Sequence, residues 1–493
     1  MKLTWNTPTI RWVYFLSALV SISLSVWSAI VQEIPNQDAL YYLRAAELFS
    51  ESKWSEGLGV YRWPFYSLLV SGIQISVGTS TLVAAQILNA ALDCMTVVTF
   101  IALLNVLSRG RGVNFAIFAA AIILLHPRLT QLRPVVVRDH GFFCFLFLTL
   151  YFVASDQQYP RVLKKALIIA AILLATLFRV EALFLCLLVA AYYLFAGAKR
   201  AASRALILIG VLVISTLLVP GYIGWTSGVF ITGFTTGHFG FDTFFAWSLS
   251  LKEQFSKLTS DLAALLPPSR NIGGIAYAGI VGAITIDTGL RALTFPIAIL
   301  ALLSFFPRPL MPRESSRLVL WFAGWQIPLL MVFAALSLFI DWRYAMAFAF
   351  VMTIPAVFTA YEAGAQWASG TVRGRLLFAA TLLTIAVPWC IAFPRDQQLE
   401  YLREAGIWIQ KNLHPDAKIL INDARIAYFS GRPLEKLIVT SVPTENDIRQ
   451  SNYVVVETPN KNAQRYSTLQ DEGHIVGKVI GSRGRSVTIY QVH

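Results

Sequence analysis

Long stretches of the chain consist almost entirely of apolar residues, and polar residues gather in the segments between them. The runs at 12–31 and 318–340 are clear examples. Each reaches the roughly 20 residues that an α-helix needs to cross the hydrocarbon layer of a membrane. A spanning segment must satisfy its backbone hydrogen bonds internally, so these runs predict helices. They are continuously apolar and do not alternate, which argues against a membrane β-barrel.

Basic residues show which ends of the apolar runs face the cytoplasm, where lysine and arginine are enriched. They flank the run 166–198 on both sides, so both of its ends are predicted to face the same compartment. The run must therefore turn back on itself. Its only polar break is the stretch from Arg179 to Glu181, which predicts two short spans joined at an extracytoplasmic tip.

The same reasoning along the whole chain predicts about eleven spanning helices. Lys2 and Arg11 precede the first apolar run, which is longer than a signal-peptide core and lacks a clear small-residue cleavage site. The N-terminus is therefore predicted to be cytoplasmic, and an odd number of spans places the C-terminal end outside. The predicted spans are 12–31, 79–107, 112–126, 140–155, 166–178, 182–198, 205–225, 288–306, 318–340, 345–361 and 376–393.

Two long segments between spans, 32–78 and 226–287, are predicted to be extracytoplasmic loops. In the first, residues 38–50 have helical periodicity, and residues 64–77 are predicted to form a short apolar helix at the membrane interface. The second is rich in glycine and aromatic residues and is predicted to be a mobile substrate loop.

The composition changes after Pro394, where turn residues begin to separate short apolar segments. An amphipathic helix is expected at 395–412. We therefore divide the chain into a transmembrane domain, residues 1–393, and an extracytoplasmic soluble α/β domain, residues 394–493. The expected strands are 418–422, 437–440, 453–456 and 486–490.

Composition agrees with a membrane protein, because 56% of the residues are hydrophobic and only 14% are charged. A soluble domain usually carries about 25% charged residues. The net charge of +13 lies mostly in short loops between spans, and no basic groove with interleaved aromatics indicates a nucleic-acid partner. The four cysteines lie in or beside apolar runs without metal-ligand spacing, which favours buried small side chains.

Charged residues near a membrane suggest function, because they are costly to bury there. Here they are predicted to lie at the outer ends of the helices. This arrangement predicts a recessed extracytoplasmic site. The residues are Asp38, Arg138, Asp139, His140, Arg179, Glu181, Asp341, Arg343 and Tyr344.

Such a site suits the transfer of a sugar from a lipid phosphate. Arginine binds phosphate oxygens through bidentate, charge-assisted hydrogen bonds, and a carboxylate can accept the proton of the attacking acceptor. Asp38 is the first candidate for this general base, and Asp139 is the second. The candidate arginines are Arg62, Arg138, Arg179 and Arg343. Further candidates are Tyr61, His140, Glu181 and Tyr344.

Simpler interpretations of the same residues stay open. Asp38 could cap a helix at 39–50, since aspartate is favoured there. Arg138 and Asp139 could form a local ion pair, and Arg179 with Glu181 could only mark a hairpin tip. Arg343 could anchor a helix end at the lipid head groups.

No tight group of histidine, aspartate and glutamate marks a metal site in the sequence. A divalent metal held by Asp38, Asp139 or Glu181 stays open, and no other cofactor is indicated.

The sequence resembles the C-type glycosyltransferase superfamily (GT-C), in the branch of the protein O-mannosyltransferases and the lipid A aminoarabinose transferases. An acidic residue, Asp38, follows the first helix in the stretch Asn36–Tyr42, and the Pro-aromatic stretch Trp63–Tyr66 follows in the same loop. A second outer loop ends in Arg138 and Asp139.

Two further matches lie later in the chain. Arg343 and Tyr344 end a late helix, and an apolar helix containing Pro355 follows. The stretch Tyr428–Arg432 resembles a motif in the tails of these proteins. The resemblance implies that Asp38 is the catalytic base and that Arg343 contacts the lipid phosphate of a polyprenyl-phosphate sugar donor.

Two departures from the family pattern bear on metal use and on the acceptor class. Residues 139–140 are Asp-His, where many relatives have Asp with a neutral neighbour or an acidic pair. Beside Arg62, the loop has Arg-Trp-Pro-Phe-Tyr in place of the common His-Pro-Pro.

The sequence thus predicts a glycosyltransferase of a bacterial inner membrane, with a protein, lipid or glycan as acceptor. A transporter or lipid flippase is the alternative, but such proteins place polar sites near the bilayer midplane and often contain inverted repeats. A non-catalytic scaffold or receptor would not require several arginines at recessed helix ends.

Overall fold

The structure, a computed structural model of the chain, divides into two compact units. Unit 1 comprises Met1–Ser23, Ala91–Leu132 and Arg138–Phe393, and unit 2 comprises Leu24–Ala90, Arg133–Val137 and Pro394–His493. The structure describes residues 8–155, 160–195, 260, 272–306, 309–338, 340–392, 399–432, 437–439, 445–458 and 474–492. The predicted span 205–225 and most of the predicted loop 226–287 lie outside these residues.

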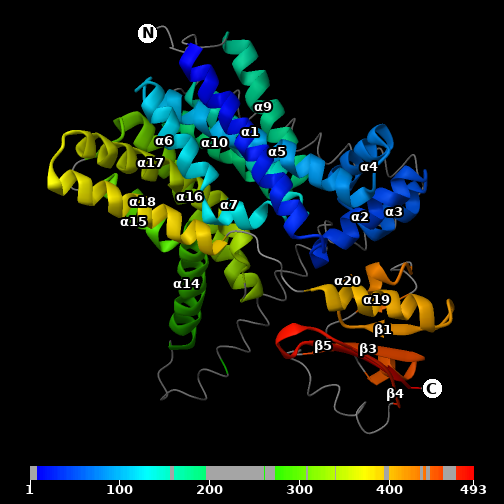
Figure 1. Cartoon of the computed structure of the whole chain (residues 1–493). Helices are drawn as coiled ribbons and strands as arrows, with labels where there is room; N and C mark the ends of the chain where they lie inside the picture. Colours follow the sequence, from blue (N-terminus) through cyan, green and yellow to red (C-terminus); the bar gives the residue numbers. More distant parts are fainter. Residues whose placement is uncertain are drawn as a thin grey trace. The chain divides into compact units, whose positions relative to one another are not determined.

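Unit 1 is helical throughout its described part (Figure 1). The unit boundaries fall within α1 (Pro8–Val31) and α5 (Thr81–Leu107), so both helices have residues in each unit. The other helices of unit 1 are α6 (Val113–Leu124), α7 (Pro127–Leu132), α8 (Asp139–Ala154), α9 (Arg161–Phe178), η1 (Val180–Ala182), α10 (Leu183–Phe195), α14 (Ile272–Leu293), α15 (Phe295–Leu303), α16 (Arg313–Ser337), η2 (Trp342–Ala345), α17 (Met346–Ala368) and α18 (Val372–Ala392).

Helix α17 packs against five other helices of unit 1, namely α6, α14, α15, α16 and α18. Most of its side chains are buried. Phe350 is fully buried and packs edge-on against Phe143 of α8, with 5.0 Å between the ring centroids. Edge-to-face aromatic pairs of this kind add to the energy of apolar burial.

Five helices of the described chain are long and apolar enough to cross a membrane, and the number rises to six if the bent pair of α14 and α15 is one span. Shorter apolar helices include α6, α8 and the pair η1 and α10. The predicted break at Arg179–Glu181 is confirmed, because α9 ends at Phe178 and η1 follows. The count of about eleven spans stays a prediction.

The segment 288–306, which was predicted to be one span, is sharply bent. Helices α14 and α15 meet at an angle of 89°, and Thr294 between them has φ of +63°. Pro296 lies in the first turn of α15, where its missing N–H breaks no helical hydrogen bond. Residues 272–287, predicted to belong to a loop, form the first part of α14.

Unit 2 combines helices from the first predicted outer loop with the C-terminal part of the chain. Residues 38–50 and 64–77 were predicted to be helical, and α2 and α4 confirm this prediction. The helices are α2 (Gln37–Ser50), α3 (Trp54–Val60), α4 (Phe65–Val77), α19 (Glu400–Asn412), α20 (Ala424–Phe429) and α21 (Glu445–Arg449), with a short turn η5 (Ser482–Gly484).

The C-terminal part of unit 2 contains a five-stranded sheet in the order β2-β1-β3-β5-β4. Figure 1 labels β1, β3, β4 and β5 of this sheet. Strand β1 is parallel to β2 and β3, whereas β5 is antiparallel to β3 and β4. Four of the strands were predicted, and β4 was not. The strands are β1 (Ile419–Ile421), β2 (Ile438–Val439), β3 (Tyr453–Thr458), β4 (His474–Ile480) and β5 (Ser486–Gln491).

The two faces of the sheet bury different side chains. On one face, Ile421, Val455 and Ile489 pack with apolar residues of α19 and α20. On the other face, Val454 and its neighbours pack against Ile448 of α21. Successive residues of a strand point to opposite faces, so both faces of the central strands need apolar cover.

Gly141, in the first turn of α8, makes a close approach to α9 possible. A Cβ atom at this position would lie 2.4 Å from the ring of Phe178. We expect Gly141→Ala to lower the free energy of unfolding by about 1–3 kcal/mol through overpacking. Gly282→Ala in α14 is the matched control, because no heavy atom lies within 4 Å of its added Cβ. Thermal unfolding of both variants in the same detergent checks this, and equal melting temperatures would contradict it.

Candidate active site

Asp38 lies in the first turn of α2 and does not cap it. The helix begins at Gln37, and its N-cap is Asn36 in an extended conformation. The alternative that Asp38 caps a helix at 39–50 is therefore wrong. The residue is exposed, and its negative charge is favoured at the positive end of the helix dipole.

Tyr61 and Arg62 lie in the short connection between α3 and α4. The ring of Tyr61 packs edge-on against Tyr42 of α2, with 4.7 Å between centroids. Tyr42 also packs against Tyr66, which is fully buried and donates a hydrogen bond to Asn89 at 2.9 Å. These contacts hold the connection against the helix that carries Asp38, and Arg62 is exposed on it.

Arg179 joins two acidic residues of unit 1 that come from different elements. Its guanidinium contacts Asp139 at the start of α8 and the Oε1 atom of Glu181 in η1, the latter at 2.8 Å. The side chains of Arg179 and Asp139 are each 8% exposed. Buried charges need partners because the loss of hydration is costly. This cluster therefore ties the start of α8 to the turn between α9 and α10.

The aromatic ring of Tyr344 also contacts Arg179. The ring lies 4.8 Å from the guanidinium carbon of Arg179, a distance at which a cation is attracted to an aromatic face. Tyr344 belongs to η2, between α16 and α17. The three elements α8, η1 and η2 therefore meet at Arg179.

Arg343, next to Tyr344, is held by a residue of its own turn. Asp341 caps η2 by accepting the backbone N–H of Arg343 at 2.9 Å, and it also accepts the side-chain Nε–H at 3.2 Å. Arg343 is half-buried. Arg138 is also half-buried, directly before Asp139, and lies close enough to Glu181 to interact with its charge.

His140 pairs with a residue that the sequence analysis did not consider. Its Nδ1 atom lies 2.7 Å from Oδ1 of Asp93, in the middle of α5, and both side chains are buried. Asp93 is an ionisable residue within a predicted span, so its position alone could have marked it as a candidate.

The structure thus brings Arg138, Asp139, Arg179, Glu181 and Tyr344 together in unit 1. His140 and Arg343 are sequence neighbours of this cluster. Asp38, Tyr61 and Arg62 belong to unit 2. Among the described residues, no group of three or more histidine, cysteine, aspartate or glutamate side chains is arranged to hold a metal ion.

The fold resembles those of solved membrane-bound glycosyltransferases. ArnT from Cupriavidus metallidurans, solved bound to undecaprenyl phosphate, matches with a TM-score of 0.55 and 13% identity, over 97% of this chain and 98% of that one. An oligosaccharyltransferase from Archaeoglobus fulgidus, tethered to an acceptor peptide, matches with a TM-score of 0.56 and 12% identity, over 99% and 74%.

A structure of the archaeal oligosaccharyltransferase AglB from Archaeoglobus fulgidus, in complex with an inhibitory peptide and a dolichol-phosphate, also matches. Its TM-score is 0.52, with 13% identity, over 90% of this chain and 68% of that one. No protein-family model matches the sequence, and no curated protein matches it. The chain therefore has the GT-C fold, and the resemblance seen in the sequence motifs is confirmed at the level of the fold.

Removing Arg179 would leave two carboxylates without their shared countercharge. We expect Arg179→Gln to lower the free energy of unfolding by about 3–5 kcal/mol, the range for breaking a buried ion pair. Combining it with Asp139→Asn should recover a large part of this loss, because one of the orphaned charges is then removed. Denaturant or thermal unfolding of the purified variants measures both effects. Wild-type stability of Arg179→Gln would show that the cluster does not hold the helices together.

Proposed function

We propose that this chain is a membrane glycosyltransferase that transfers a sugar from a polyprenyl-phosphate donor to an acceptor at the extracytoplasmic face. The observation that carries the proposal is the fold, shared over nearly the full lengths of this chain and of ArnT. ArnT was solved with undecaprenyl phosphate and AglB with a dolichol-phosphate, both of which are polyprenyl-type phosphates. The long apolar helices agree with a membrane location.

In this proposal Asp38 is the general base. The acceptor hydroxyl or amine gives its proton to the Asp38 carboxylate as its heteroatom attacks the anomeric carbon of the sugar. The bond between that carbon and the phosphate oxygen breaks, and polyprenyl phosphate leaves with the electron pair. A carboxylate in the first turn of a helix, exposed to solvent, can reach such a proton.

The leaving phosphate needs positive charge beside it, because negative charge develops on it as the bond breaks. Arg179 has two carboxylate partners, so we assign it mainly to holding α8, η1 and η2 in place. Arg138 and Arg343 are half-buried and Arg62 is exposed, so their guanidinium groups are better placed to reach a ligand. Arginines positioned at a departing phosphate stabilise the charge that develops on it.

Tyr344 and Glu181 contribute through Arg179, which they hold on two sides. Asp139 is the second candidate for the base, but its carboxylate is buried and already paired with Arg179, whereas Asp38 is exposed. The geometry therefore favours Asp38 over Asp139 for this role.

The test is donor turnover by purified, reconstituted protein, with a panel of polyprenyl-phosphate sugars and release of polyprenyl phosphate as the readout. We expect Asp38→Asn to lose at least about two orders of magnitude in turnover, the usual contribution of a general base. Arg343→Ala should weaken donor binding or turnover, because a phosphate contact is lost. Glu51→Gln at the far end of α2 is the matched control and should match the wild type.

Two outcomes would contradict the proposal. Wild-type turnover in Asp38→Asn would remove Asp38 as the base. If the wild type consumes no donor in the panel but moves lipid-linked sugars across the vesicle membrane, the protein is a flippase or transporter.

A further inference from the structure

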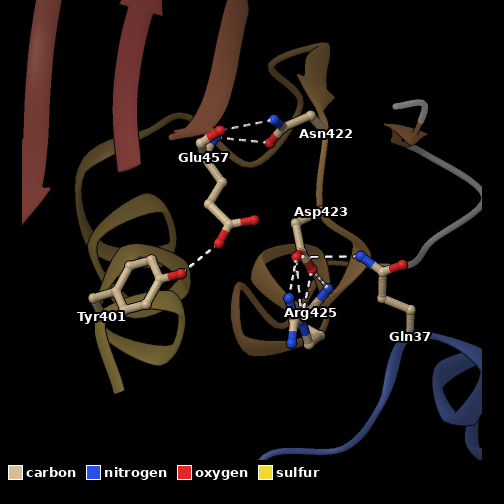
Figure 2. A network of polar contacts seen from close by, with 6 residues as sticks. All are labelled: Gln37, Tyr401, Asn422, Asp423, Arg425 and Glu457. Carbon is tan, nitrogen blue, oxygen red and sulfur yellow. Dashed lines mark hydrogen bonds and ion pairs between the residues drawn. The ribbon is translucent and has the colours of Figure 1, made fainter. Parts of the chain in front are cut away.

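The segment that leads into α2 is fastened to the C-terminal part of unit 2. Glu33 forms an ion pair with Arg403 of α19 at 3.1 Å. Ile34 is buried in the apolar core that α19, α20 and the sheet share. Gln37, the first residue of α2, donates its side-chain amide to Oδ2 of Asp423 at 3.2 Å (Figure 2).

Asp423 is itself rigidly held, so it can serve as a fixed point. It is 1% exposed and caps α20 by accepting the backbone N–H of Arg425 at 2.8 Å. The guanidinium of Arg425 contacts both carboxylate oxygens, at 2.9 Å to Oδ1 and 2.5 Å to Oδ2 (Figure 2). Two-point contacts between arginine and carboxylate fix orientation as well as position.

The same carboxylate stays ionised at neutral pH. Burial by itself raises the pKa of Asp423, but the hydrogen bonds and the charge of Arg425 outweigh it and hold the pKa below its ordinary value. The pair therefore stabilises the fold above the ordinary pKa of an aspartate, and this contribution is lost as the pH falls through the lowered value. Asp423 remains an acceptor for Gln37 throughout the neutral range.

A second set of hydrogen bonds anchors the backbone beside Asp423 to the sheet. Asn422 exchanges two hydrogen bonds with the backbone of Glu457, at 2.8 and 3.3 Å. The side chain of Glu457 accepts the hydroxyl of Tyr401 from α19 (Figure 2). Asp423 thus stands where β1 ends, on a framework built from β1, β3 and α19.

The residue before Gln37 is fastened as well. Asn36 accepts the backbone N–H of Val136 at 2.9 Å, so residues 133–137 hold the N-cap of α2. Asp38 follows directly after these two tethered residues. The start of the helix that carries Asp38 is therefore fixed by two segments that are far away in the sequence.

We propose that Asp423, clamped by Arg425, is a positioning residue for Asp38 and acts through the side-chain amide of Gln37. This inference rests on the proposed function of Asp38. Catalytic groups must be held to within about half an ångström of their working geometry. A displacement of about 1 Å can cost roughly 100-fold in rate. The C-terminal part of the chain would then be part of the catalytic machinery, because it sets the position of the base.

The decisive variant is Gln37→Met, which removes the donor without adding charge beside Asp38. We expect kcat to fall about tenfold, with an unchanged KM for the donor, because the base is displaced while donor binding is not. Asp423→Asn should have a similar effect. Gln410→Met, at an exposed position of α19, is the matched control and should match the wild type.

A paired change separates positioning from general damage. The double variant Gln37→Met with Asp423→Asn is compared with the two single variants. If both residues act through their shared bond, the double variant should lose little more kcat than Asp423→Asn alone, whereas independent effects would combine and lower kcat further. Thermal unfolding of every variant confirms that the fold is retained.

Hydrogen exchange supplies a readout that does not depend on activity. In Gln37→Met, the first turns of α2 should exchange faster than in the wild type, and those of α4 should not change. If the wild type turns over donor and Gln37→Met matches it in kcat, the positioning role is wrong and the proposed function stands. If the wild type has no turnover, the proposed function fails, and unchanged exchange in Gln37→Met would then overturn the clamp itself.

Discussion

The organisation of the helical unit depends on the neutralisation of one buried cation. Arg179 is almost inaccessible, and an unpaired guanidinium in such surroundings would cost several kcal/mol. The cost is offset only if Asp139, Glu181 and the ring of Tyr344 all reach it. These partners come from three elements, so the charge requirement fixes how the elements meet. Arg138 and Arg343, which are attached to the same elements, are positioned by the same constraint.

Most helices of the structure were predictable, because a run of apolar residues long enough for a membrane has few alternatives to a helix. The helices and strands that the sequence did not predict correctly differ for physical reasons. Residues 272–287 are rich in glycine, which weakens a helix in water but is tolerated in apolar surroundings. The bend at Thr294 depends on a single positive φ angle, which the apolar pattern does not show. Strand β4 was missed because Gly477 and a register shift interrupt its alternation.

The residues that meet at Arg179 were named from the sequence, but the contacts between them were not predicted. Placing charges at helix ends led to Asp139, Arg179, Glu181 and Tyr344, and the structure brings them together. Asp93 was missed because the search was for charges at helix ends, and Asp93 lies in the middle of an apolar run. The bond between Gln37 and Asp423 joins residues 386 positions apart. No local sequence pattern predicts such a contact. The two residues were also assigned from the sequence to different domains, 1–393 and 394–493.

The chemical nature of the bridge fits the role we propose for it. A lysine or arginine at position 37 would pair more strongly with Asp423, but it would place a positive charge next to Asp38. A neighbouring positive charge stabilises the carboxylate and makes it a weaker base. The amide of Gln37 transmits the position of Asp423 and adds no charge. The charged pair is instead the one between Asp423 and Arg425, which holds Asp423 rigidly and does not involve position 37. Arg425 thus makes the anchor rigid, and Gln37 connects the anchor to α2 without placing a positive charge beside Asp38. A direct ion pair between position 37 and Asp423 could not do both.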